Sequence, residues 1–314
     1  MNWISSRVTS SKDLLGISYV LMAALTVALL PNTAKLALND GVNTSTLLLS
    51  RGVIGLLVLS TVLAFTKTVP IIPKNLIFQS VIAGLSAAFF IVGLYQAIQS
   101  IEISLALLLL YLYPVGVAVI NHFTGQSRLT VFRIGWSSLA LFGIFLSLAN
   151  SFDIKSMVGV GWALMAMVFT VAVTIANDRP SKEMGALTSN FYLTLWGTLL
   201  FTVGFLFFGE LSLPQSHLGW IGLITNGSVY CFTWLVFFAG ANLIGTTRAS
   251  MISVSDLLFT AVLAYILFGE WFSLIQWTGF FIVFFSLIAL ESPKGFWSRT
   301  FGKLTGNDNQ GSTK

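Results

Sequence analysis

The sequence predicts an all-α polytopic membrane protein with ten transmembrane helices, arranged as two inverted five-helix repeats. Three observations predict this fold. The chain of 314 residues is 56% hydrophobic and only 9% charged, with a mean hydropathy of +0.88. Its apolar residues fall into long runs separated by short loops, and its second half repeats features of the first. A soluble protein of this length needs far more charge to cover its surface.

The ten helices follow from the length of the apolar runs. A helix needs about 20 mostly apolar residues to cross the hydrocarbon core of a bilayer. The runs that meet this condition are 14–38, 44–65, 75–98, 103–121, 130–150, 157–177, 187–208, 218–241, 245–268 and 273–291. Residues 1–13 are polar, and the run after them is too long for a signal peptide, so it is expected to be the first helix.

The loops predict the orientation, because cytoplasmic loops are enriched in Lys and Arg. With the N-terminus inside, thirteen basic residues fall on the cytoplasmic side and only Lys155 falls outside. The thirteen are Arg7, Lys12, Lys67, Lys74, Arg128, Arg133, Arg179, Lys182, Arg248, Lys294, Arg299, Lys303 and Lys314. Lys35 and Arg51 lie within helices and belong to neither group. Both termini are therefore expected in the cytoplasm.

The two halves of the chain resemble each other at a nearly constant offset. The segment from Gly16 matches the segment from Gly159. The segments around Ala97 and Gly125 match those around Ala239 and Gly269, and the offset in sequence number is almost the same in all three places. Because each unit holds five helices, the two copies must be inverted in the membrane. Inverted repeats are typical of secondary transporters, whose substrate site lies near the midplane between the repeats.

These features divide the chain into three regions. The first repeat is expected at 14–150 and the second at 157–291. Residues 292–314 form a basic cytoplasmic tail, in which Phe296, Trp297 and Phe301 favour an anchor at the membrane interface. A site for a specific partner is the alternative for this tail.

With these features the sequence resembles the drug/metabolite transporter superfamily, in its ten-helix EamA type. The resemblance covers about 14–291, and the residues that carry it are Arg51, Ser104, Pro114, Ala239, Gly245, Thr246, Gly269 and Glu270. It implies secondary transport of a small organic metabolite, in the direction of export, across the inner membrane of a bacterium. Two positions depart from the pattern of the family. In the first repeat, the position that corresponds to Glu270 is Gln126, which is not an acid. In the second repeat, the position that corresponds to Pro114 is Asp256, where the family usually has proline.

Asp256 is a carboxylate near the middle of an otherwise apolar helix. It lies eleven residues after Gly245, which places it roughly 16 Å into a core about 30 Å thick. Thr246, Ser250, Ser253, Asp256 and Thr260 recur at steps of three and four and form one polar stripe. The stripe either lines a hydrated substrate path or joins helices by hydrogen bonds. We expect Asp256 to bind a cationic group or to couple transport to protons.

Arg51 is the second charge at membrane depth, roughly 10 Å from the outer side and so at a level similar to that of Asp256. It is a candidate for substrate binding, and a structural role at a helix end is the alternative. Amino acids or related amines suit Asp256 and Arg51 together, because amino acids carry both charges.

Aromatic and proline positions supply the remaining candidates. Flat rings bind apolar or cationic groups, and the EamA resemblance places several of them on helices that line the central cavity. They are Tyr95, Tyr111, Tyr113, Trp196, Tyr230 and Trp234. Asn32 is a further candidate because it follows Pro31, which kinks a helix and frees a carbonyl as Pro114 does. The predicted substrate site is Asp256, Arg51, Asn32, Tyr95, Tyr111, Trp234 and Ser253.

Several other functions lack the residues that they require. The single Cys231 and the separated His122 and His217 give no metal site, and no phosphate-binding G-x-x-x-x-G-K-[ST] loop is present. We expect no cofactor, no enzymatic activity and no nucleic-acid partner. The expected partners are a small-molecule metabolite, membrane lipid and, as a candidate, protons. The protein is expected to be a monomer or a homodimer. A metabolite importer and a membrane assembly protein without transport remain the alternatives.

Overall fold

The computed structural model describes residues 11–101, 103–125, 131–147, 157–256, 259 and 273–291, and every regular element within them is a helix. The elements of the first half are α1 Ser11–Val27, α2 Leu30–Asn39, α3 Thr44–Phe65, η1 Lys74–Leu76, α4 Ile77–Ser100, α5 Ile103–Leu110, α6 Tyr113–Phe123 and α7 Val131–Ser147. Those of the second half are α8 Met157–Ala176, α9 Asp178–Met184, α10 Ala186–Phe208, α11 His217–Ile244, α12 Thr246–Ser253 and α14 Leu274–Glu291.

The all-helical fold is confirmed, whereas the number of crossings stays a prediction. Within the described ranges, five helices are long and apolar enough to cross a membrane: α3, η1 with most of α4, α8 with α9, α10 and α11. Shorter apolar helices lie at Ile134–Leu146 and Leu274–Val283. Large apolar side chains such as Phe208, which is 90% exposed, cover the outside. Such a surface is typical of a protein embedded in lipid.

Two of the predicted helices are interrupted where prolines predict a kink. The run 14–38 is divided into α1 and α2, and the run 103–121 into α5 and α6. Pro31 and Pro114 each stand in the first turn of the helix after the interruption. Proline lacks the N–H that would continue the preceding helix, and its fixed φ suits a first turn.

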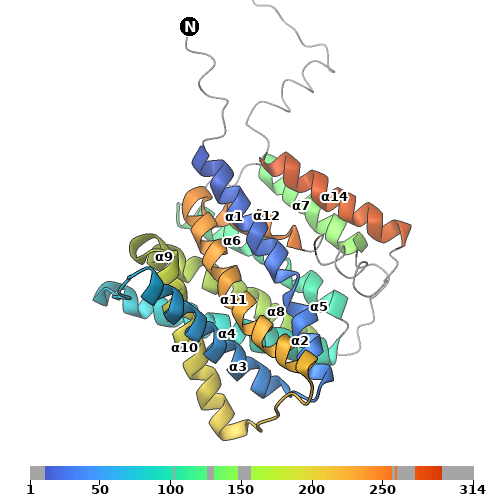
Figure 1. Cartoon of the computed structure of the whole chain (residues 1–314). Coiled ribbons are helices and arrows are strands. Elements are labelled where there is room, and N and C mark those ends of the chain that lie inside the picture. Colours follow the sequence, from blue (N-terminus) through green and yellow to red (C-terminus); the bar gives the residue numbers. More distant parts are fainter. Residues whose placement is uncertain are drawn as a thin grey trace, which may run out of the picture.

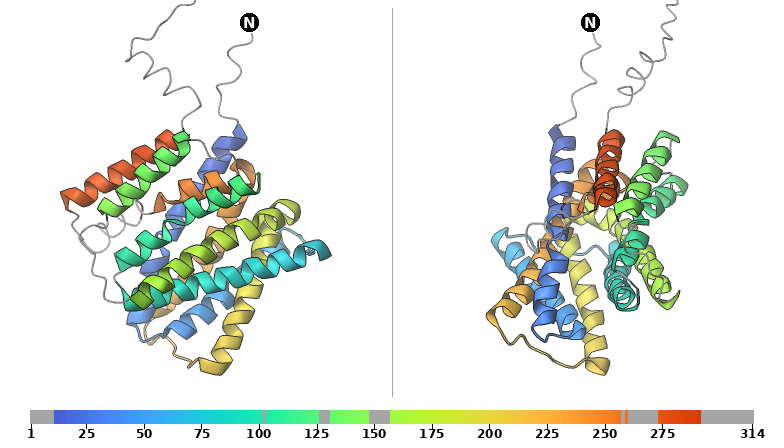
Figure 2. Two further views of the ribbon diagram at one scale, coloured as in Figure 1. Left: turned by 180° about the vertical axis from the view of Figure 1, so that it is seen from behind. Right: turned by 90° about the vertical axis from the view of Figure 1, so that its right-hand side faces the viewer.

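Helices from the two halves pack against each other. Helices α1 and α2 lie along α11, α4 lies along α8, and α3 contacts both α10 and α11. Figure 1 shows α7 and α14 side by side at one edge of the bundle, and Figure 2 shows the same pair from two other directions. The largest buried apolar cluster includes Val20, Ala83, Val173, Leu193 and Phe238, so it joins α1, α4, α8, α10 and α11.

Small residues permit these close helix crossings. A Cβ atom on Gly143 of α7 would lie 2.9 Å from the carbonyl oxygen of Gly279 and from the backbone nitrogen of Val283 in α14. A Cβ atom on Gly135, also in α7, would meet nothing within 4 Å. The close α7–α14 contact therefore requires glycine at position 143, where a side chain would clash, and does not require glycine at position 135.

This difference predicts opposite effects for the same substitution on one helix. We expect Gly143→Ala to lower the free energy of unfolding by about 1–3 kcal/mol, because neither helix backbone can move away cheaply. Gly135→Ala is the matched control, and we expect it to be neutral or to stabilise by up to about 1 kcal/mol through helix propensity. Thermal unfolding of both variants in detergent measures this. Equal effects at the two positions would contradict the described crossing.

Candidate functional site

Two helix interruptions from opposite halves of the chain lie against each other. The first separates α5 from α6 at Tyr111 and Leu112, and the second follows α12 at Val254 and Ser255. The hydroxyl of Tyr113 hydrogen-bonds to the hydroxyl of Ser253 across this contact. It also lies 3.2 Å from the carbonyl oxygen of Ser250, which accepts a hydrogen bond from Ser253 at 2.9 Å. The interruption after α12 has no proline and was not predicted.

Asp256 follows the second interruption directly. Its carboxylate interacts electrostatically with the hydroxyls of Tyr111 and Tyr113, which come from the interruption between α5 and α6. At the repeat offset that relates Ala97 to Ala239, Asp256 corresponds to Pro114 in the first turn of α6. The structure therefore brings together three of the predicted site residues: Asp256, Tyr111 and Ser253.

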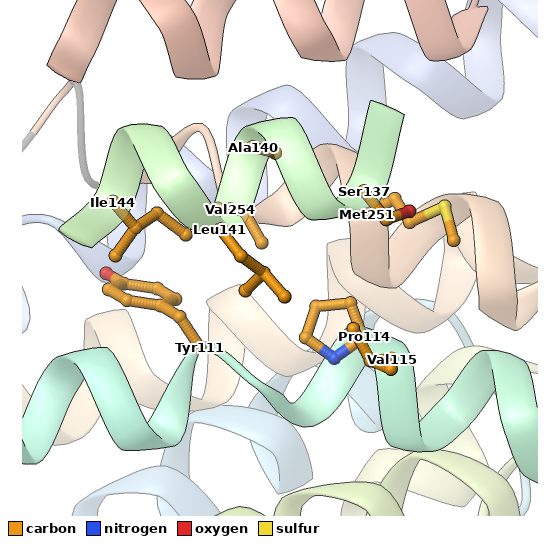
Figure 3. A pocket seen from close by; sticks show the side chains of 9 residues that line it. All are labelled: Tyr111, Pro114, Val115, Ser137, Ala140, Leu141, Ile144, Met251 and Val254. Carbon is orange, nitrogen blue, oxygen red and sulfur yellow. The ribbon is translucent and has the colours of Figure 1, made fainter. Parts of the chain in front are cut away.

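A small apolar void lies beside this contact, between the α5–α6 interruption, α7 and α12. Figure 3 shows its lining, with Tyr111 and Ile144 at one end and Ser137 and Met251 at the other. The void measures about 20 Å³. One water needs roughly 10–15 Å³ by this measure, whereas pockets for small organic ligands measure about 300–1,000 Å³. This void must widen before it can hold a metabolite.

Arg51 lies in a second cluster, where α3, α4 and α11 meet. Its side chain is 5% exposed, and its guanidinium carbon lies 3.9 Å from the centre of the Tyr230 ring. The guanidinium also interacts with the hydroxyl of Tyr95. Tyr95 and Tyr230 thus lie at Arg51, whereas Tyr111 and Tyr113 lie at Asp256.

The other predicted residues lie in different surroundings. Trp234 stacks on Phe238 with ring centres 5.3 Å apart and packs against the largest apolar cluster, so its observed contacts are packing contacts. The buried indole N–H of Trp196 has no hydrogen-bond acceptor among the described residues. The backbone of Asn32 lies in α2 and its side chain is outside the described part. Thr260, Gln126, Gly269, Glu270, Lys155 and the tail 292–314 also lie outside the described residues.

Buried asparagines join the helices, and they are not among the residues predicted from the sequence. Asn121 of α6 donates to Thr246 at 3.0 Å and to Thr247 at 2.7 Å in α12. Asn226 of α11 donates to the carbonyl oxygen of Leu30, beside the interruption between α1 and α2, at 3.0 Å. Thr246, one member of the predicted polar stripe, therefore takes part in hydrogen bonding between helices. The signal that could have found these residues is an asparagine within an apolar run.

Two loops interlock at one end of the bundle, and we call residues 40–46 and 210–216 the loop latch. The Asp40 carboxylate accepts hydrogen bonds of 2.7 Å from the backbone N–H groups of Gln215 and Ser216, at the start of α11. Thr46 donates to the carbonyl oxygen of Glu210 at 3.1 Å and accepts from the N–H of Ser212 at 3.0 Å. These bonds hold the α2–α3 and α10–α11 connections together.

The comparisons with known proteins agree with this architecture. A model of the EamA-like transporter family matches residues 14–149 and 157–291. The chain belongs to the EamA-like transporter family. The resemblance seen in the sequence is thereby confirmed, and the family is one of multi-pass membrane transporters and not of enzymes.

Relatives of this EamA-like chain have transporter names without a substrate. An uncharacterized transporter, YxxF, of Bacillus subtilis (strain 168) is 23% identical over 216 residues, which are 67% of this chain and 68% of that protein. An uncharacterized transporter of Archaeoglobus fulgidus (strain ATCC 49558 / DSM 4304 / JCM 9628 / NBRC 100126 / VC-16) is 26% identical over 184 residues, or 58% of this chain. That match spans 65% of the archaeal protein, less than two thirds of its length.

One solved crystal structure shows a similar fold. It has a TM-score of 0.70 to this EamA-like chain and covers 90% of this chain and 98% of its own. The sequence identity is 16%, so the similarity concerns the fold alone.

The loop latch gives a prediction for the dependence of stability on pH. The backbone N–H of Ser216, with that of Gln215, holds the pKa of Asp40 below its ordinary value of 3.8. The pKa of Asp40 is lower in the folded state than in the unfolded state. The ionised carboxylate therefore stabilises the fold at pH values above the unfolded-state pKa, and this stabilisation is lost as the pH falls through the folded-state pKa. At neutral pH we expect Asp40→Asn to unfold at a lower temperature than wild type, and the difference to shrink below about pH 4.

Thermal unfolding in detergent over this pH range checks the prediction. Glu210→Gln is the matched control, because Glu210 contributes its backbone carbonyl and not its carboxylate to the latch. A difference between wild type and Asp40→Asn that stays constant with pH would exclude the carboxylate as the source of the stabilisation.

Proposed function

We propose that this protein is a secondary transporter that moves a small organic metabolite, an amino acid or amine-like molecule, across the bacterial inner membrane by alternating access. The observation that carries the proposal is the contact between the two helix interruptions, with Asp256 beside it. Interrupted helices near the midplane expose backbone groups that bind substrates or ions in many transporters. A carboxylate at membrane depth is costly and is retained where it has a function.

The packing between the halves supports the inverted repeats on which alternating access depends. A Cβ atom on Gly16 would lie 2.6 Å from Ile244, and a Cβ atom on Gly159 would lie 2.6 Å from Ile101. The offset that relates Gly16 to Gly159 also relates Ile101 to Ile244. The α1–α11 and α4–α8 contacts are thus the same contact made twice. Ten crossings, with the repeats at 14–150 and 157–291, fit this symmetry.

The proposed orientation places both termini and the basic tail 292–314 in the cytoplasm, because basic residues are concentrated on that side. The loop latch then lies on the outer side. With a void of about 20 Å³ beside Tyr111, the contact between the two interruptions leaves no room for a metabolite in the described conformation. Transport requires the two halves to rock apart on one side at a time.

We assign Asp256 two roles, contact with a cationic group of the substrate and binding of the coupled proton. Tyr111 and Ser253 lie at the same contact, and Arg51 with Tyr95 forms a second one. Asn32 and Trp234 remain predicted contacts. The direction of export rests on the family resemblance, and import by the same mechanism is the alternative.

Asp256→Asn tests the proposal because it removes the charge and keeps the size of the side chain. We expect uptake of a panel of amino acids and amines into proteoliposomes to fall at least about tenfold. We also expect the dependence of wild-type uptake on a pH gradient to disappear in the variant. Thermal stability against the same panel, at two pH values, measures binding independently of transport.

Asp13→Asn is the matched control, since the Asp13 side chain is partly exposed in the first turn of α1 and should not affect uptake. If Asp256→Asn transports as wild type does and keeps the dependence on pH, Asp256 has no role in binding or coupling. If the wild type moves no metabolite of the panel under any gradient, the proposed transport activity is wrong for these substrates.

A further inference from the structure

Arg51 is a buried cation that the described part of the protein does not neutralise. Its side chain is 5% exposed, and none of the ion pairs among the described residues includes it. Apart from its interaction with Tyr95, it has no hydrogen-bond acceptor among those residues. An uncompensated buried charge is strongly destabilising, so a structural arginine is normally paired with an acid or with several carbonyl groups.

The surrounding helices hold the guanidinium in a defined position. Gly227 lets α11 approach α3 closely, because a Cβ atom there would lie 3.3 Å from the Cα atom of Arg51. Tyr230 is one turn further along α11, and its ring covers the guanidinium at 3.9 Å. Stacking of this kind uses the face of the guanidinium and leaves the N–H donors, which lie in its plane, for another group.

We propose that Arg51, Tyr95 and Tyr230 form an anion subsite, which binds the carboxylate of the transported metabolite. The planar guanidinium matches a carboxylate in a bidentate pair, and the Tyr95 hydroxyl can donate to the same oxygen atoms. The inference rests on the proposed transport function and narrows it, because a simple amine has no group that this subsite attracts. The substrate class is therefore an organic carboxylate, and with Asp256 binding a cationic group it is narrowed to amino acids.

The loop latch lies close to this subsite. Thr46, which bonds to both Glu210 and Ser212, and Leu47 are about one helical turn before Arg51 on α3. Tyr95 packs against the apolar cluster that contains Leu47 and Val42, of which Val42 belongs to the loop latch. The loop latch and the subsite are therefore linked through α3 and this apolar cluster.

Matched carboxylate and amide ligands test the subsite with the full-length protein in detergent. The probes are leucine with leucinamide, phenylalanine with phenylalaninamide, and phenylacetate with phenylacetamide. For wild type we expect carboxylates to bind at least about tenfold more tightly than their amides, measured by thermal stabilisation against ligand concentration. For Arg51→Gln we expect the ratio of carboxylate affinity to amide affinity to fall to about one. Arg51→Lys keeps the charge but not the planar fork, so an intermediate ratio is expected.

Arg179→Gln is the matched control, because Arg179 is exposed on α9 and pairs with Glu183. If Arg51→Gln does not fold, Tyr95→Phe supplies the same comparison by removing one donor and keeping the ring, and a reduced ratio is expected. A ratio that is unchanged in Arg51→Gln or in folded Tyr95→Phe overturns the subsite, as does a wild type that does not distinguish carboxylates from amides. Uptake measured in proteoliposomes, as for Asp256→Asn, would then still decide the transport proposal separately.

Discussion

In the hydrocarbon core of a membrane, every backbone N–H and C=O group needs a partner within the protein, because no water is available. This constraint governs the positions of the helix interruptions. Each interruption leaves backbone groups without their helical partners, and each lies against another helix in the described part. Asn226 bonds to the carbonyl of Leu30 beside the first interruption. Tyr113 covers the carbonyl of Ser250 near the last one. The polar groups that a substrate could use are therefore held in place by the packing that the membrane requires.

Hydrogen bonds between side chains help to hold the helices together in lipid, where the hydrophobic effect does not drive helices to associate. Lipid tails are as apolar as leucine, so helices associate through close packing of small residues and through polar contacts between helices. Gly16, Gly143 and Gly227 provide the first, and Asn121 with its two threonine acceptors provides the second. Part of the polar stripe around Thr246 thus stabilises the bundle, while Ser253 lies at the contact between the interruptions. The same stripe therefore includes residues that join helices and a residue at the contact between the interruptions, because it runs from a packed helix end to the membrane interior.

The sequence predicted the all-helical fold and several of the residues that lie where the two interruptions meet. The helix 44–65 coincides with α3, and the kinks at Pro31 and Pro114 are present, because apolar length and proline chemistry act locally. The interruption after α12 was missed, since no proline marks it, although the repeat aligns Asp256 with Pro114. The partners of Arg51 could not be predicted, because Tyr95 and Tyr230 come from α4 and α11 and meet α3 only through the tertiary packing. The spacing of residues along one helix predicts which side chains share a face, but it does not predict which other helix packs on that face.

The charged groups depart from the symmetry of the repeats. At the offset that relates Gly16 to Gly159, Arg51 corresponds to Thr194, Tyr95 to Phe238 and Tyr230 to Ala87, so the proposed anion subsite has no copy related by the repeat. At the offset that relates Ala97 to Ala239, Asp256 has Pro114 as its counterpart. The contact that the two halves share at Gly16 and Gly159 supports the helix crossings, whereas the residues proposed to bind substrate are ones that only one half carries. In the proposed mechanism, alternating access uses the symmetric contacts, while substrate choice depends on the asymmetric ones.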